Sequence, residues 1–402
     1  MQKSNYKINS RTYLINYTLS YIFFPIAVWP LIYGRFLNFS QIGMIVGVSS
    51  LVQTVLELPS GALADLFGRR NIIILAKIIR FISYLVIVLS LNIDNVFLFL
   101  MLGEVLWKTA EAFASGSEQA LIYDSLKENR KEEEYEKLEA QSFFYYNIFH
   151  LLAAIIGGFL YEIDFRLPFV ALLIPALFSV INSFFFQEPI LDSEKYSLRN
   201  YIKQNILGFK HIFRNKIIFL ISFYSVITVS TYMIGTFLLY QQSVNEMIAV
   251  PKYVGLVAAG LYLSRAIASW IYSRIYFKIN KENFAIFLAW IQSASSFLLI
   301  VPFVPIAILG LVIRYMSDGF RKPYLTNIQN QYIKSTYRAT AISAIALLVS
   351  LVSVLLSPLV GYGIDLYNAR VVIAFTGFFA FIALPVAMQL KKIIRLKQKN
   401  SL

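Results

Sequence analysis

Long apolar stretches recur from one end of this 402-residue chain to the other, and they limit its fold more than any other feature. A helix needs about 20 apolar residues to cross the hydrocarbon core of a bilayer. Residues 71–91, NIIILAKIIRFISYLVIVLSL, form one such stretch. The composition agrees, because 58% of the residues are hydrophobic and 14% are charged, against about 45–50% and about 25% in soluble domains. The sequence therefore predicts an all-α membrane protein.

We predict twelve membrane-spanning helices from these apolar windows. They cover residues 12–33, 40–63, 71–91, 96–121, 139–161, 167–187, 216–240, 253–276, 284–302, 304–328, 339–362 and 370–390. The longest loop, 188–215, divides them into an N-terminal six-helix half, 1–187, and a C-terminal six-helix half, 216–402. Within this loop apolar residues recur every three or four positions between basic ones. That spacing favours an amphipathic helix on the inner leaflet, and a solvated linker is the alternative.

The net charge of +14 follows the positive-inside rule of membrane proteins. Lys and Arg are concentrated in alternate loops, on the side that the two termini share. The opposite loops hold Arg35, Arg166, Lys252 and Arg370. We therefore expect a multi-pass protein of a bacterial inner (plasma) membrane with both termini in the cytoplasm. The basic excess is explained by the lipid bilayer, so no nucleic-acid partner is expected.

Several kinds of chemistry are excluded by what the chain contains. It has no cysteine, and its histidines are His150 and His211, so disulfides, thiolate catalysis and a histidine-based metal site are not expected. No G-x-x-x-x-G-K-[ST] loop is present, so ATP is not hydrolysed by that route. We predict no cofactor, no metal and no enzymatic activity, and we expect a monomer.

The two halves resemble each other at a few positions. Gly103, Glu111 and Phe113 have the same spacing in helix 96–121 as Gly310, Asp318 and Phe320 have in helix 304–328. Together with the six-plus-six layout, this spacing suggests duplicated halves around a central site.

The loop between helices 40–63 and 71–91 reads GALADLFGRRN and follows ELPS. It resembles the signature loop of the major facilitator superfamily, G-x-L-A-D-[RK]-x-G-R-[RK]. The matching residues are Gly61, Leu63, Ala64, Asp65, Gly68, Arg69 and Arg70, whereas Leu66 replaces the usual basic residue. The resemblance implies a superfamily fold of two pseudo-symmetric six-helix halves and transport by alternating access.

The resemblance also implies a gate at the inner ends of the helices. Asp65 would lie near the positive N-terminal end of helix 339–362, and the matching arginine would pair with an acid, here Asp124. A loop that only sets topology is the alternative. FFFQEPI and YRATAIS resemble segments of the superfamily's bacterial exporters, whereas AAIIGG departs from the G-P-x-x-G-G of drug–proton antiporters.

Charged residues inside two predicted helices mark the candidate site. Glu104, Lys108 and Glu111 share one helical face, and so do Arg314, Asp318 and Arg321. A charge at the bilayer centre costs about 2.5–3.5 kcal/mol, so these faces should line the protein interior or a water-filled cavity. Glu57, Lys77, Arg80 and Arg265 also lie within helices, where a salt bridge and a functional role are both open.

Three interpretations of these charges remain open. In the first, Glu104 pairs with Lys108, which leaves Glu111 as the proton carrier and Asp318 as the second candidate. In the second, the charges bind a charged part of the substrate. In the third, they form a structural network. Tyrosines such as Tyr224, Tyr232 and Tyr240 either line a cavity or pack against lipid.

We expect a secondary active transporter that couples protons to efflux of a small lipophilic or amphipathic compound. The direction of transport rests on the resemblance alone. The alternative is an uptake or facilitated transporter for a specific metabolite.

Overall fold

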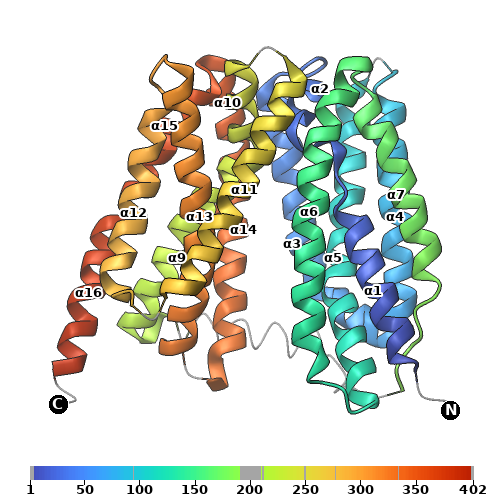
Figure 1. Cartoon of the computed structure of the whole chain (residues 1–402), viewed down its shortest axis with the longest axis horizontal. Coiled ribbons are helices and arrows are strands. Elements are labelled where there is room, and N and C mark those ends of the chain that lie inside the picture. Colours follow the sequence, from blue (N-terminus) through green and yellow to red (C-terminus); the bar gives the residue numbers. More distant parts are fainter. Residues whose placement is uncertain are drawn as a thin grey trace. The chain divides into compact units, whose positions relative to one another are not determined.

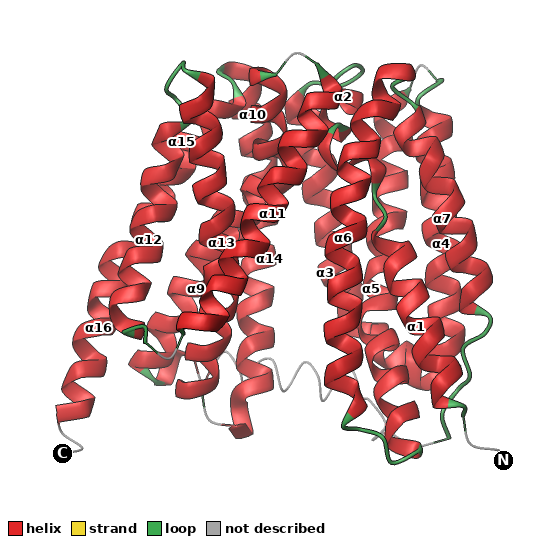
Figure 2. Ribbon diagram, in the orientation of Figure 1, coloured by secondary structure: helices red, strands yellow, loops and turns green. Residues whose placement is uncertain are grey.

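The structure is a computed structural model that describes residues 4–93, 95–190, 210, 212–248, 250–276, 278–333 and 335–399. These described residues form helices joined by short loops, and no strand is found among them (Figure 2). Helices satisfy their backbone hydrogen bonds internally, which the interior of a bilayer requires. The predicted amphipathic helix in loop 188–215 falls largely on residues 191–209, outside the described residues.

The helices labelled in Figure 1 follow one another along the chain with short connections. Before loop 188–215 they are α1 (Tyr6–Tyr21), η1 (Phe24–Ala27), α2 (Trp29–Tyr33), α3 (Phe39–Phe67), α4 (Arg69–Ser90), α5 (Val96–Glu128), α6 (Glu134–Ile163) and α7 (Leu167–Ser183). After this loop they are α9 (Lys216–Ile234), η2 (Gly235–Leu239), α10 (Tyr240–Met247), α11 (Pro251–Ile275), α12 (Lys281–Leu298), α13 (Val304–Tyr332), α14 (Ser335–Leu366), α15 (Ala369–Phe381) and α16 (Ala383–Lys399).

Each of the twelve predicted helices coincides with one of these helices or with a consecutive set of them. Among the described residues, 7 helices are long and apolar enough by themselves to cross a membrane. The helices α5 and α13 are also long, but charges interrupt their apolar sequence. These are the two helices in which the sequence places the candidate site.

Packing divides the chain into two compact units. The first unit comprises Met1–Leu37, Ile45–Tyr201 and Val250–Leu256, and the second comprises Asn38–Met44, Ile202–Ala249 and Val257–Leu402. The first residues of α3 therefore pack within the second unit, where the backbone N–H groups of Phe39 and Ser40 each donate to the Asp365 carboxylate at 2.7 Å. A carboxylate in this position caps the start of a helix.

Small residues allow close helix contacts at equivalent places in the two units. At Gly103 of α5, an added Cβ would lie 2.5 Å from Cγ1 of Ile87 in α4. At Gly310 of α13, it would lie 2.9 Å from Cβ of Leu298 in α12. Helices in membranes associate largely through such close packing. The spacing that Gly103 and Gly310 share in the sequence thus corresponds to a shared packing role.

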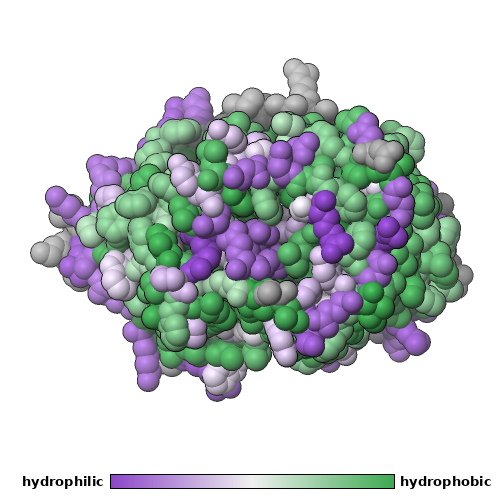
Figure 3. Space-filling view, turned by 90° about the horizontal axis from the view of Figure 1, so that it is seen from above, coloured by the Kyte–Doolittle hydropathy of each residue, from purple (hydrophilic) through white to green (hydrophobic). Residues whose placement is uncertain are grey.

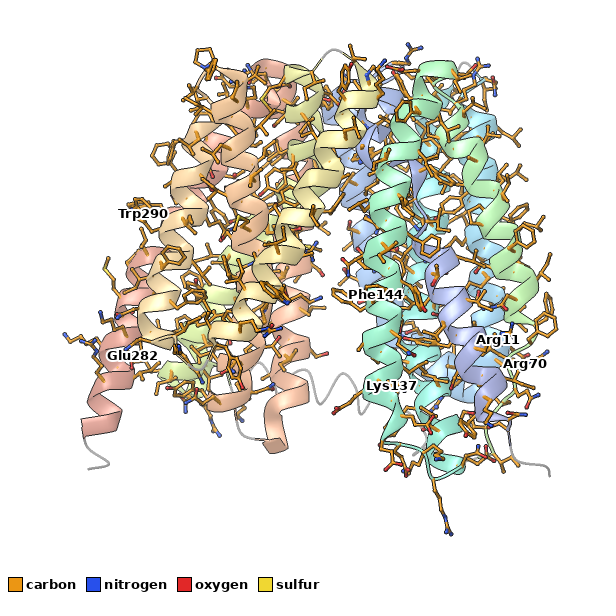
Figure 4. All side chains as sticks on the ribbon, in the orientation of Figure 1. Arg11, Arg70, Lys137, Phe144, Glu282 and Trp290 are labelled. Carbon is orange, nitrogen blue, oxygen red and sulfur yellow. The ribbon has the colours of Figure 1, made fainter. Side chains whose placement is uncertain are left out.

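The outward surface of the helices is apolar, as contact with lipid requires. Trp290 of α12 is 58% exposed and points away from its neighbouring helices (Figure 4). The helix ends differ, because hydrophilic and hydrophobic residues are interspersed over them in the view of Figure 3.

Candidate functional site

A break in the first predicted helix leaves backbone carbonyl groups at its end that contact a buried polar cluster in the first unit. The prediction of one helix over 12–33 is wrong in this detail, because α1 ends at Tyr21 and the chain resumes as η1 and α2. Pro25 explains the break, since a proline has no N–H and its ring clashes with the carbonyl four residues earlier. The Ser20 carbonyl instead accepts a hydrogen bond from Arg80 Nη1 at 3.2 Å. The Tyr21 carbonyl lies 3.2 Å from Nδ1 of His150.

Ion pairs link α4 to α5 within the first unit, where the two helices run side by side (Figure 1). Lys77 Nζ lies 2.5 Å from Glu118 Oε1 and donates to Ser20 Oγ at 2.8 Å. Arg80 Nη2 lies 3.9 Å from Glu111 Oε1. Lys77, Arg80 and Glu118 are buried, and Glu111 is partly buried. The lysine and the arginine therefore face carboxylates and not lipid, as the cost of a charge in hydrocarbon demands.

The predicted pairing of Glu104 with Lys108 is wrong. Lys108 Nζ instead lies 2.7 Å from Glu111 Oε2, on the next turn of α5. The Glu104 carboxylate accepts a hydrogen bond from the Tyr33 hydroxyl at 2.7 Å. Tyr33 ends the short helix α2, so the break at Pro25 determines where this hydroxyl lies. Glu104 forms no ion pair with any other residue that the structure describes.

The second unit has an irregular helix at the equivalent position. Between α9 and α10 the chain winds into a π-helical turn at Gly235–Leu239. Such turns are frequently found at functional sites. The Tyr240 ring lies against Gly235, where any Cβ would collide with it. Gly235 thus makes room for a ring whose hydroxyl accepts a hydrogen bond from Arg314 Nε at 2.6 Å.

Arg314 is held almost entirely by neutral groups. Its Nη1 donates to the Gln292 carbonyl at 2.9 Å and to the Ser296 hydroxyl. The side chain is only 2% exposed, and its Nη2 has no hydrogen-bond partner among the described residues. The guanidinium group also lies 5.2 Å from the centre of the Tyr240 ring, within cation–π range.

Asp318 lies between two other arginines. Arg265 Nε is 2.9 Å from Asp318 Oδ2, and Arg321 pairs with the other carboxylate oxygen. Both guanidinium groups also lie against the Tyr232 ring, at 5.6 Å for Arg265 and 5.2 Å for Arg321. The predicted charged face of helix 304–328 is thus buried against α9 and α11 within the second unit.

The two clusters differ in net charge. In the first unit Lys77, Arg80 and Lys108 pair with Glu111 and Glu118, and Glu104 accepts from Tyr33, so cations and carboxylates balance in number. In the second unit Asp318 pairs with Arg265 and Arg321, while Arg314 is bonded to neutral groups, which leaves an excess of positive charge among the described side chains. Among the described residues, no three His, Asp or Glu side chains are close enough to bind a metal ion.

The residues of the predicted gate lie at the ends of α3, α4 and α5. Gly61 and Asp65 belong to α3, but the Asp65 side chain lies outside the described residues. Gly68 has a φ of 87°, a conformation that favours glycine. Arg69 pairs with Asp124, as the resemblance to the superfamily implies. The role of this pair in gating stays a prediction.

Glu188 gives the FFFQEPI segment a physical role at this end of the first unit. Its two carboxylate oxygens accept hydrogen bonds from the backbone N–H groups of Arg69 at 2.9 Å and Arg70 at 2.6 Å. The negative charge therefore caps the positive N-terminus of α4. The Arg70 side chain donates to the Phe186 carbonyl at 2.6 Å. Arg70 and Arg11 both lie at this end of the unit (Figure 4).

Some of these residues were not predicted from the sequence. Tyr33, Ser20, Gln292 and Ser296 are ordinary helix residues in the sequence, and only tertiary contacts bring them to charged groups. The proline at position 25 was the one available signal for Ser20 and Tyr33, because it predicts a break in the first helix.

Long apolar helices around two buried charged clusters define a polytopic membrane protein. The sequence profile of the Major Facilitator Superfamily matches residues 12–320. The chain belongs to this superfamily.

A curated relative is an uncharacterized transporter of Buchnera aphidicola subsp. Schizaphis graminum (strain Sg). It is 32% identical over 137 residues, which are 31% of this chain and 34% of the relative. The match thus spans about a third of the relative's length.

Solved structures with the same fold include three transporters. The nucleoside transporter NupG has a TM-score of 0.75 at 12% identity, covering 96% of this chain and 98% of NupG. A bacterial homologue of the human lysosomal transporter Spinster has a TM-score of 0.72 at 15% identity, covering 96% of each chain. A D-xylose–proton symporter has a TM-score of 0.70 at 12% identity, covering 95% of each chain. At these identities the likeness establishes the fold alone.

Proposed function

We propose that this protein couples proton entry to the efflux of a small lipophilic or amphipathic compound across a bacterial inner membrane. Glu104, Lys108, Glu111, Arg314 and Asp318 are the proposed proton and substrate residues. The compound would reach its site by alternating access, with the superfamily's two halves opening in turn to each side. Both termini would lie in the cytoplasm, and the protein would act as a monomer.

The observation that carries the coupling proposal is the arrangement around Glu104. This carboxylate has the Tyr33 hydroxyl as its hydrogen-bond donor, while the neighbouring Lys108 pairs with Glu111. A carboxylate inside a membrane protein without its own cation can hold a proton. We therefore propose Glu104, in place of Glu111, as the proton carrier.

Lys108 offers a way to transmit the protonation of Glu104. It lies four residues after Glu104 and three before Glu111, so its ammonium group can reach either carboxylate. With Glu104 protonated, Lys108 stays with Glu111. When Glu104 releases its proton, the new negative charge attracts Lys108 and weakens its bond to Glu111. Since Arg80 of α4 also faces Glu111, this exchange would alter the contact between α4 and α5.

The gate proposed for the inner helix ends comprises Gly61, Asp65, Gly68, Arg69, Arg70 and Asp124. Its support is the ion pair between Arg69 and Asp124, together with the cap that Glu188 places on α4. Opening on this side would require the ion pair to break.

The second candidate is an uptake or facilitated transporter for a specific metabolite. The observation that favours it is the arginine-rich cluster of the second unit, which suits selective binding of a charged group better than promiscuous export. NupG and the D-xylose–proton symporter are named for specific metabolites, which agrees with this alternative.

Transport into inside-out vesicles tests the proposed function. We would energise the vesicles to an acidic interior and add amphipathic dyes that are cationic, neutral or anionic. We expect at least one dye to accumulate, and a protonophore to abolish the accumulation. Glu104→Gln should reduce it to background because the amide cannot release a proton. Glu162→Gln is the matched control, since Glu162 forms only a long 3.8 Å pair with Lys252 near a helix end.

Each result separates one part of the proposal from the others. No movement of any dye would contradict efflux of amphipathic compounds. Accumulation that survives the protonophore would contradict proton coupling. Normal accumulation in Glu104→Gln would show that Glu104 is not the proton carrier, and Glu111→Gln would then be the next variant.

A further inference from the structure

We propose that the arginine cluster of the second unit binds an anionic group, so the transported compound is an organic anion with an aromatic or otherwise flat body. The binding group would be a carboxylate, phosphate or sulfonate. This inference rests on the proposed function because it takes the cluster to be part of the substrate site. It narrows the class of compound from any amphipathic molecule to one that carries negative charge.

Arg314 supplies the first line of evidence. It is among the largest fully buried side chains of the chain, and it forms no ion pair with the described residues. Its Nε and Nη1 are bonded to neutral oxygens, and its Nη2 is left without a partner. A buried charge without a counter-ion is costly. A bound carboxylate or phosphate would supply both the missing charge and the missing acceptor.

The pairing of the Asp318 carboxylate supplies the second line of evidence. Its two carboxylate oxygens are already divided between Arg265 and Arg321, so Asp318 does not neutralise Arg314. Arg321 also has a buried Nε without a partner among the described residues. Arg80 of the first unit likewise has a buried Nε without a partner among the described residues, but this unit has no excess of cations, because Lys77, Arg80 and Lys108 are matched in number by Glu104, Glu111 and Glu118. The anion site is therefore assigned to the second unit.

Tyrosine rings around the arginines indicate the shape of the rest of the ligand. The Tyr240 ring centre lies 5.5 Å from that of Tyr315, and Tyr315 lies 5.7 Å from Tyr262. Aromatic groups prefer offset or edge-on contacts at such distances. A flat apolar body attached to the anion would pack against these rings while Arg314 binds the charge. Entry would require the surrounding helices to open, as alternating access implies.

The geometry also predicts how Asp318 affects the affinity for the anion. Asp318 acts as an internal counter-ion for Arg265 and Arg321, so an incoming anion competes with it for these arginines. Removing the negative charge of Asp318 should therefore tighten anion binding, whereas removing the charge of Arg314 should weaken it. A substitution that merely damages the fold would weaken binding in both cases.

Equilibrium dialysis with three naphthalene probes tests the proposal. Radiolabelled 2-naphthoate, 2-naphthylmethanol and 2-naphthylmethylammonium share one body and differ in charge. They would be dialysed against the full-length protein in lipid nanodiscs, with empty nanodiscs as background. We expect saturable binding of the naphthoate alone, competed by naphthalene sulfonate.

The variants give the decisive comparison. Arg314→Gln should weaken naphthoate binding about ten- to hundredfold, the value of one charge-assisted hydrogen-bonding group. Asp318→Asn should tighten it several-fold. Arg395→Gln should leave it unchanged, because Arg395 pairs with Glu282 elsewhere in the unit. Gel filtration of each variant would show that it is folded, and Arg314→Lys would restore part of the affinity.

Three results would overturn the anion site: naphthoate binding no better than the ammonium probe, full affinity in Arg314→Gln, or weaker binding in Asp318→Asn. The vesicle assay separates these results from the proposed function. Naphthoate binding without proton-dependent transport would support the anion site and contradict the coupling. Proton-dependent transport of cationic dyes without naphthoate binding would support the coupling and contradict the anion site.

Discussion

Lys108 shows how a single residue can have two possible partners in the sequence and one in the structure. Glu104 and Glu111 both lie within reach along α5, so spacing alone cannot choose between them. The choice depends on Tyr33, which supplies a hydrogen bond to Glu104, and on Arg80, which adds positive charge near Glu111. Both of these residues come from other helices. The partner of a charge inside a helix bundle is therefore a tertiary property.

Gly157 gives a prediction at the same scale. A Cβ at this position of α6 would collide with the backbone carbonyl of Phe24, which cannot rotate away as a side chain can. Gly157→Ala should therefore destabilise the protein by about 1–3 kcal/mol, the usual cost of overpacking. Thermal unfolding in detergent would measure the change. Gly116→Ala is the matched control, because nothing lies within 4 Å of its added Cβ.

A small or stabilising effect of Gly157→Ala would contradict the close approach of α6 to η1. At Gly116 the exchange should be neutral or stabilising, since alanine is the better helix former by about 1 kcal/mol. The two variants differ only in the space around the new methyl group.

At the scale of helices, apolar length predicted where the helices are but not where they break. The window over 12–33 is predominantly apolar, so it predicts one helix, while the structure ends α1 at Tyr21. The π-helical turn at Gly235–Leu239 was likewise hidden inside the predicted helix 216–240. Both irregular turns bring a tyrosine, Tyr33 or Tyr240, to a charged group. The irregular part of each helix thus has more bearing on the candidate site than the regular part.

Replacing Pro25 tests the origin of the first break. Pro25→Ala restores an N–H and removes the ring clash. A proline inside a helix costs about 3 kcal/mol, so this substitution favours a continuous helix. We expect α1 to extend beyond Tyr21, so amides of residues 22–26 should exchange with deuterium more slowly. Proton-dependent transport should fall as Tyr33 moves away from Glu104.

Pro30→Ala serves as the control for this experiment. Pro30 lies in the first turn of α2, where a proline is tolerated because no helical partner is lost. Hydrogen exchange measured by mass spectrometry should therefore change little in this variant. Unchanged exchange at residues 22–26 in Pro25→Ala would mean that tertiary packing, and not the proline, breaks the helix.

At the scale of the whole molecule, the distribution of Lys and Arg predicts the orientation in the membrane. The chain has no cysteine, so single cysteines can be introduced without a background. Arg166→Cys should react with a membrane-impermeant maleimide in intact cells, because its loop is predicted to lie outside. Lys131→Cys should react only after permeabilisation. Labelling of both in intact cells, or the reverse pattern, would contradict the predicted topology.

The sequence by itself determined the membrane class, the positions of the twelve helices and the family, because apolar length and a local loop motif are one-dimensional signals. It also predicted which two helices carry buried charge, since cost in lipid depends on residue type and depth alone. Only the tertiary structure decided which carboxylate pairs with Lys108 and which arginine of the second unit, Arg314, is left without a carboxylate. Those outcomes depend on Tyr33, Arg80, Tyr240 and Arg265, which arrive from other helices. Interactions between helices are set by packing in three dimensions, and no periodicity along one helix contains them.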